Sequence, residues 1–150
     1  EDPLYSGLTP AYRTADMPIS NITELAAIDG MDRVSFEILL PHVIALPGRT
    51  PVNVNTASVQ VLQSLGPNID LGTAEGLLQM RENGGFADYS GVFAPLVAPD
   101  LVPWISETSD YFQLKAVVQI DTVRVSLFTV LHRNASNGAV APILRSLGTI

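Results

Sequence analysis

The spacing of apolar residues in this chain of 150 residues changes after Trp104, and this change limits the fold more than any other feature. Before Trp104, apolar residues recur three and four positions apart between Gly, Pro and Asn stops, as in helices. After it, they alternate with polar residues, as in strands. The sequence therefore predicts an α+β protein, with a helical domain at residues 1–104 followed by antiparallel strands at residues 105–150.

Helical spacing between residues 21 and 104 predicts two tandem units, each made of a helix, a Gly-containing turn and a second helix. In the first unit, Asn21 and Glu24 have the spacing of a capping box, and Asp32 is placed to cap the following helix. The proline-rich residues before them predict an extended lead-in that is held down by Tyr5 and Tyr12.

The second unit opens with the stretch PVNVNTASVQVLQSLG, residues 51–66. We expect Asn53, Asn55 and Thr56 to cap and brace its first helix, with Asn55 or Thr56 as the cap itself. A second helix is predicted over about residues 73–83, and a third, short helix after residue 88.

Two further residues of this unit are predicted to serve its fold. Phe86 is expected to fill the core together with Val59, Leu62 and Leu77. Arg81 is expected to hold nearby carbonyls or a carboxylate rather than a phosphate.

The strand region predicts a hairpin with one apolar face. Phe112, Leu114 and Val118 alternate with polar residues in the first strand, and the second strand continues the alternation up to Arg133. Residues 139–150 are expected to return as an edge strand, because Pro142 does not suit a central one. Since so small a sheet is marginal alone, we expect a covering helix that is missing from this chain.

Tandem helix-hairpin-helix units commonly grip nucleic-acid phosphates, so nucleic-acid binding is the alternative function to test. Residues 1–104 carry twelve acidic residues against four arginines, a net charge of −8, whereas residues 105–150 carry +1. The hairpin GPNIDLGTA has a proline and Asp70 where phosphate would approach, and no Lys or Arg lies between Arg49 and Arg81. A polyanion would be repelled, so we expect no nucleic-acid partner.

Enzyme classes find little support in the sequence. The two histidines, His42 and His132, are far apart in the chain, and the absence of cysteine removes thiol and zinc-thiolate chemistry. No G-x-S-x-G, P-loop or G-x-G-x-x-G motif is present. The sequence therefore predicts a protein that is not an enzyme. The acidic residues leave calcium open as a cofactor, although their spacing is not that of an EF-hand.

Several stretches in order resemble one family: YRTADMPISNITEL, then VNVNTAS, then TAEGLLQMRENGGF, then SDYFQL and a closing VLHR. Over almost the whole chain, the sequence is similar to the C-terminal portion of general secretion pathway protein K, a minor pseudopilin of type II secretion systems. For the fold, the resemblance implies SAM-like helix-hairpin-helix units inserted in a pilin-like sheet, whose late strands are residues 109–133.

For function, the resemblance implies a structural protein at the tip of the pseudopilus, which helps to initiate its assembly and supports protein export. Its partners would be minor pseudopilins I and J, and secreted substrates are further candidates. It would be periplasmic and anchored in the inner membrane by an N-terminal helix absent from this chain.

The resemblance also implies site residues. Because the lead-in EDPLY matches an acidic stretch of the family, Asp2 is the first candidate calcium ligand and Glu1 the second. Interface hot spots favour aromatic residues, so Trp104, Tyr111 and Phe128 are candidates for contacts with sister subunits, with core packing as the alternative for each.

Overall fold

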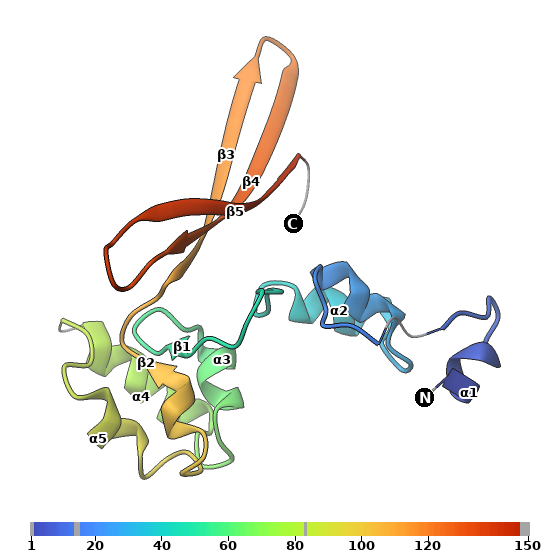
Figure 1. The fold of residues 1–150 in the computed structure, drawn as a ribbon. Coiled ribbons are helices and arrows are strands. Elements are labelled where there is room, and N and C mark those ends of the chain that lie inside the picture. The colour runs from blue at the N-terminus through green and yellow to red at the C-terminus, as the bar shows by residue number, and fades with distance from the viewer. Residues whose placement is uncertain (1, 14–15, 83, 148–150) are drawn as a thin grey trace. The chain divides into compact units, whose positions relative to one another are not determined.

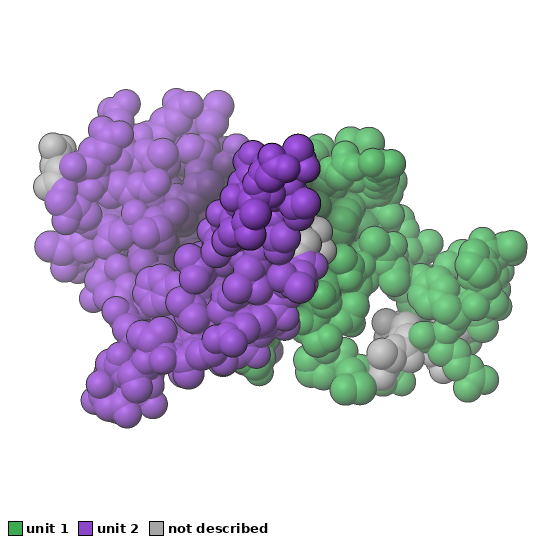
Figure 2. Space-filling view, turned by 90° about the horizontal axis from the view of Figure 1, so that it is seen from above, with its two compact units in different colours: residues 1–48 green, residues 49–150 purple. Residues whose placement is uncertain are grey.

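The computed structural model describes residues 2–13, 16–82 and 84–147, and the chain divides into two compact units, residues 1–48 and 49–150 (Figure 2). This division differs from the boundary expected between residues 104 and 105. Its reason is local: Ile105 is buried in the helical core, and residues 105–106 pair with residues 52–53. Whether residues 1–104 form one inserted domain stays a prediction.

The described residues of unit 1 form three short helical elements: α1 (Asp2–Ser6), the 3-10 helix η1 (Ile22–Ala27) and α2 (Arg33–Leu39). The capping box is confirmed, because Asn21 accepts from the Thr23 N–H while Glu24 accepts from the Asn21 N–H. Asp32 caps α2 by accepting from the Ser35 N–H at 2.7 Å. The first helix of this pair is a 3-10 helix.

The lead-in of unit 1 is less extended than predicted. It begins with the single helical turn α1, in which Pro3 suits the first turn because its missing N–H is not needed there. The predicted anchors are confirmed: Tyr5 is buried, and its ring centroid lies 5.0 Å from that of Tyr12. The Tyr12 hydroxyl donates to the Ala27 carbonyl, which ties the lead-in to the end of η1.

Unit 2 begins with a helical core of six elements (Figure 1). These are β1 (Val52–Asn53), α3 (Val59–Ser64), α4 (Leu71–Glu82), α5 (Tyr89–Phe93), η2 (Val102–Trp104) and β2 (Ile105–Ser106). β1 and β2 pair in parallel. Helices this short are stable mainly through packing, and they surround buried apolar side chains that include Val54, Leu62, Leu77, Phe86 and Phe93.

The core position predicted for Phe86 is confirmed. Its ring meets that of Phe93 edge-on at a centroid distance of 5.3 Å, a favourable aromatic geometry. Leu62 and Leu77 are buried in the same cluster, and the partly buried Val59 packs against it.

A three-stranded antiparallel sheet follows, in the order β3 (Tyr111–Ile120), β4 (Val123–Arg133) and β5 (Val140–Leu147). The predicted hairpin and edge strand are confirmed. Residues Val118 and Val125 face each other across β3 and β4, which puts the alternating apolar residues of both strands on one face. On β5, Pro142 pairs with Leu131 and Leu144 with Val130, so the register shifts by one residue beside the proline.

Candidate functional site

The turn between α3 and α4 is where a helix-hairpin-helix protein would receive a phosphate. Here Asp70 occupies the start of α4: its carboxylate accepts from the Thr73 N–H at 2.8 Å, and its carbonyl accepts from the Ala74 N–H at 2.9 Å. Two hydrogen bonds from Thr73 lower the pKa of the Asp70 carboxylate: the bond from the backbone N–H has the larger effect, and the bond from the side chain has the smaller one. A carboxylate that stays ionised at the helix N-terminus fills the position that an anion would need.

Arg81 lies in the last turn of α4 and points back to the segment before α3. Its Nη1 donates to the carbonyl of Ala57 at 2.6 Å and to the carbonyl of Val54 at 3.0 Å. The predicted role in holding carbonyls is therefore confirmed, and the guanidinium binds backbone rather than a charged ligand.

The cap of α3 differs from the prediction. The N-cap is Ser58, whose side chain accepts from the Val61 N–H, and not Asn55 or Thr56. The reason is that residues 53–57 form a turn first: the N–H groups of Thr56 and Ala57 both donate to the Asn53 carbonyl, so the helix starts two residues later.

Asn55, which was expected to brace α3, makes two long-range contacts outside that helix instead. Its Oδ1 accepts from the Phe86 N–H at 2.8 Å, and its Nδ2 donates to the Glu107 carbonyl at 3.2 Å. Gly85 is suited to this contact, since its φ is +83° and an added Cβ would lie only 3.1 Å from Asn55 Oδ1. One carboxamide thus joins the loop after α4 to the strand region.

Sequence reasoning missed the polar residues on the other side of this contact, Ser109 and Arg133. Asn53 Nδ2 donates to Ser109 Oγ at 2.8 Å, and Arg133 Nη2 donates to the Ser109 carbonyl at 2.8 Å. These residues lie more than fifty and more than twenty positions from their partners, respectively, so no local spacing could have linked them.

The three aromatic interface candidates are all at least partly accessible, so none is a fully buried core residue. Trp104 lies under the guanidinium of Arg49, with 5.5 Å between Arg49 Cζ and the ring centroid. Tyr111 stacks on its cross-strand partner His132 at 4.7 Å, and the Lys115 ammonium lies 5.2 Å from the Phe128 ring. Such cation–ring contacts keep large side chains ordered at a surface. Their part in an interface stays a prediction.

One face of the sheet exposes a continuous set of apolar side chains. Phe112, Leu114, Val118 and Ile120 on β3 are 43–72% exposed, and Val123 and Val125 on β4 are 62% and 47% exposed. Cross-strand pairing places these side chains together. Contiguous exposed apolar surface of this kind is typical of a surface that packs against another protein segment.

The predicted calcium ligands fall outside what the structure describes: Glu1 lies outside the described residues, and the side chain of Asp2 is not described. Among the described residues, no group of three or more His, Asp or Glu side chains could hold a metal. Calcium takes six to eight oxygen ligands, so the site needs more donors than these two residues. Calcium binding stays a prediction.

The helical core, its polar contacts to residues 107–109 and the open sheet define an α+β chain with one large apolar face left uncovered. Two family models match it, both described as type II secretion system (T2SS) protein K, over residues 1–48 and 52–103. The type II secretion system protein K of Pseudomonas aeruginosa is 32% identical over 99% of this chain, and that of Klebsiella pneumoniae is 35% identical over 89%. The chain belongs to the type II secretion system protein K family.

The same fold is found in a solved structure. A chain of the crystal structure of the GspK–GspI–GspJ complex from the enterotoxigenic Escherichia coli type 2 secretion system matches all of this chain with a TM-score of 0.78, at 24% identity. The chain spans 44% of the length of the Pseudomonas and Klebsiella relatives and 55% of the matched chain in the complex.

Proposed function

We propose that a protein containing this chain acts as a minor pseudopilin of a type II secretion system. It sits at the tip of the pseudopilus, helps to initiate its assembly and supports the export of folded proteins across the outer membrane. Family membership supports the secretion role, and the match to a chain of the GspK–GspI–GspJ complex supports a place in an assembly. The role is structural rather than enzymatic.

The observation that carries this proposal is the open apolar face of the sheet. A three-stranded sheet with apolar side chains exposed on one face is marginal in water, and burying each Val or Leu gains about 1.5–3 kcal/mol. The resemblance to pilin-like folds supplies the cover: an N-terminal helix from outside this chain packs on the face that carries Leu114, Val118 and Val125.

The same helix would anchor the protein in the inner membrane, with the units described here in the periplasm. Within the described residues, every helix is too short or too polar to cross a bilayer. In this proposal the anchor belongs to another part of the protein, and about 20 apolar residues would suffice for it.

The partners in this proposal are minor pseudopilins I and J, with secreted proteins as further candidates. The solved chain that shares this fold belongs to a complex of GspK with GspI and GspJ. The test is co-expression: a tagged protein containing this chain is expected to copurify with both subunits, and its deletion is expected to stop secretion through that system. Failure of every pairing under native conditions, together with unimpaired secretion, would contradict the proposal.

Nucleic-acid binding can be tested in the same preparation. We expect no retardation of duplex DNA at low salt, because Asp70 fills the helix N-terminus and Arg81 is engaged with carbonyls. Retardation that weakens as salt is raised would favour the alternative instead.

A further inference from the structure

Residues 107–110 link β2, in the helical core, to β3, in the sheet. From the core side, two amides hold this link: Asn55 binds the Glu107 carbonyl and Asn53 binds Ser109 Oγ, at 3.2 and 2.8 Å. The link is also anchored at its start, where the Val54 N–H donates to the Ser106 carbonyl at 2.9 Å. The core therefore holds Ser106, just before the link, and Glu107 and Ser109 within it.

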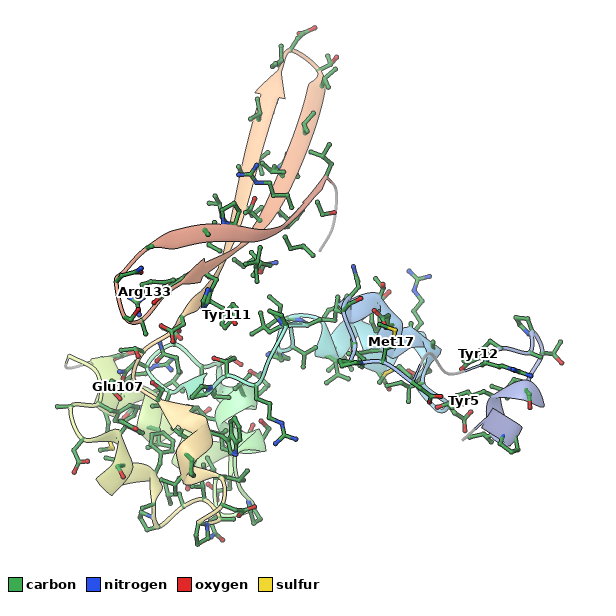
Figure 3. All side chains as sticks on the ribbon, viewed as in Figure 1. Tyr5, Tyr12, Met17, Glu107, Tyr111 and Arg133 are labelled. Atoms are coloured by element: carbon green, nitrogen blue, oxygen red, sulfur yellow. The ribbon has the colours of Figure 1, made fainter. Side chains whose placement is uncertain are left out.

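From the sheet side, Arg133 holds the other end of the link. Arg133, the last residue of β4, donates from Nη2 to the Ser109 carbonyl at 2.8 Å and from its backbone N–H to the Asp110 carbonyl at 2.7 Å. Its guanidinium is also 3.5 Å from the Asp110 carboxylate and 5.5 Å from the centre of the Phe112 ring. Figure 3 shows Glu107, Tyr111 and Arg133 around this connection.

Ser109 is the residue that both sides share. Its hydroxyl accepts from Asn53 of the core, and its carbonyl accepts from Arg133 of the sheet. We propose that Asn53, Ser109 and Arg133 form a clamp that makes residues 107–110 a fixed joint, so that the sheet and the helical core move as one body. Asn55 reinforces the clamp at Glu107.

A short polar link without such contacts would be free to rotate about its backbone dihedrals, since exposed Ser and Thr segments gain little by ordering. The clamp offsets that entropy with hydrogen bonds that are partly shielded from water. In the proposed assembly, a fixed joint would make the orientation of the helical core follow that of the sheet. The clamp itself does not depend on the proposed function, and the test below uses the isolated chain.

Cleavage by a glutamate-specific protease tests the joint directly, because the exposed Glu107 precedes the peptide bond whose carbonyl Asn55 holds. Ser109→Ala removes only the hydroxyl that Asn53 binds, and we expect it to speed cleavage after Glu107 roughly two- to tenfold, the range of one net hydrogen bond. Asn53→Ala is expected to give at least the same increase, because it also removes the acceptor of the Asn55 N–H at 2.9 Å. Cleavage after Glu75 in α4 is expected to stay unchanged, because the helical core remains folded.

Two comparisons distinguish the loss of the clamp from a general loss of stability of the chain. Ser136→Ala is the matched control: it removes a hydroxyl in the turn between β4 and β5, which donates to Asn134 at 2.6 Å, and it should leave cleavage after Glu107 unchanged. The double variant Asn53→Ala, Ser109→Ala should be cleaved no faster than Asn53→Ala alone, since that single variant already removes the bond to Ser109. Equal rates for Ser109→Ala and Ser136→Ala, or additive effects in the double variant, would overturn the proposal.

A distance measurement tests the rigid-body consequence. The chain contains no cysteine, so the exposed positions Glu75→Cys on α4 and Thr122→Cys at the tip of the β3–β4 hairpin can be spin-labelled without background. We expect a narrow distribution of distances between the labels and a clearly broader one after Ser109→Ala. Once circular dichroism shows that the strands are formed, a distribution that is already broad in the parent, or unchanged in the variant, would refute the fixed joint.

Discussion

At the residue scale, Arg81 illustrates how charged side chains in the helical core bind backbone groups. It reaches two carbonyls of the turn before α3, those of Val54 and Ala57, both belonging to buried residues. A guanidinium can satisfy two acceptors at once, which a lysine ammonium does with less geometric fit. Arg81 therefore connects α4 to the turn of residues 53–57 by hydrogen bonds.

We predict that Arg81→Met destabilises the chain by about 1.5–3 kcal/mol, because the aliphatic stem stays while two carbonyls lose a charged donor. Urea unfolding followed by circular dichroism measures the change. Arg33→Met is the control, since its side chain is 89% exposed and pairs with the exposed Glu37, so its effect should stay within about 0.5 kcal/mol. Equal effects of the two variants would show that the contacts of Arg81 contribute nothing.

Capping carboxylates give the chain a predictable acid sensitivity. The pKa of Asp70 is lowered from its ordinary value of 3.8 by the Thr73 N–H and then by the Thr73 side chain. Hydrogen bonds from the Ser20 side chain and then from the Asn21 N–H likewise lower the pKa of Glu24, ordinarily 4.5. A lowered folded-state pKa means that the stabilisation is complete above the ordinary value and is lost as pH falls through the lowered one.

We predict that Asp70→Asn flattens the acid limb of the stability curve. Asparagine still caps the helix but does not titrate, so the variant should lose less stability than the parent between about pH 5 and pH 2. Thermal melting across this range measures it. Glu75→Gln, which removes a charge from the exposed middle of α4, is the control for net charge; the same flattening in both variants would assign the effect to net charge.

At the scale of elements, glycines decide how closely the helices approach. A Cβ added to Gly66, just after α3, would lie 2.7 Å from the Leu96 carbonyl oxygen, a backbone atom that cannot rotate away. A Cβ on Gly76, inside α4, meets no atom within 4 Å. The two positions therefore respond in opposite directions to the same substitution.

We predict that Gly66→Ala destabilises the chain by about 1–3 kcal/mol through overpacking, whereas Gly76→Ala stabilises it by about 0.5–1 kcal/mol through helix propensity. Chemical denaturation of the two variants beside the parent tests both signs. A neutral Gly66→Ala would mean that α3 and the segment after α5 are free to separate.

Elements with a local signal were predictable from the sequence. The capping box at Asn21 involves residues three positions apart, and β3 and β4 alternate over ten and eleven residues with a tight turn between them. Two features had no such signal. β1 and β2 are two residues long and about fifty residues apart, and the start of α3 could not be fixed because four capping-type residues precede it between Asn53 and Ser58.

The residues of the candidate site likewise divide into those with a signal in the local sequence and those without one. The sequence was enough to predict that Arg81 binds carbonyls or a carboxylate rather than a phosphate, since the hairpin lacks the features of a phosphate site, but not which of the two it binds. It could not reveal that Asn53 and Asn55 reach residues 107–109, because side-chain bonds between distant segments follow from the packed core and not from spacing. The calcium and interface predictions remain to be tested by experiment.

At the scale of the whole molecule, substitutions on the two faces of the sheet can be compared to test which face is covered. Val118 pairs with Val125 on the apolar face, and the next pair, Gln119 with Arg124, lies on the opposite face. All four side chains are exposed in this chain, so one substitution on each face starts from a similar exposure but has a different expected consequence in a protein that includes the covering helix.

We predict that Val118→Lys disrupts the longer protein while Gln119→Lys does not. In the isolated chain, both substitutions should change the free energy of unfolding by less than about 1 kcal/mol, the span of strand propensity at exposed sites. In a protein that includes the covering helix, Val118→Lys places a charge in a buried contact without a partner. Its melting temperature, its copurification with pseudopilins I and J and secretion should therefore all fall. Adjacent residues of a strand lie on opposite faces of the sheet, so only one of the two substitutions can fall on a covered face. If the two variants behaved alike in a protein that includes the covering helix, the apolar face would not be the covered one.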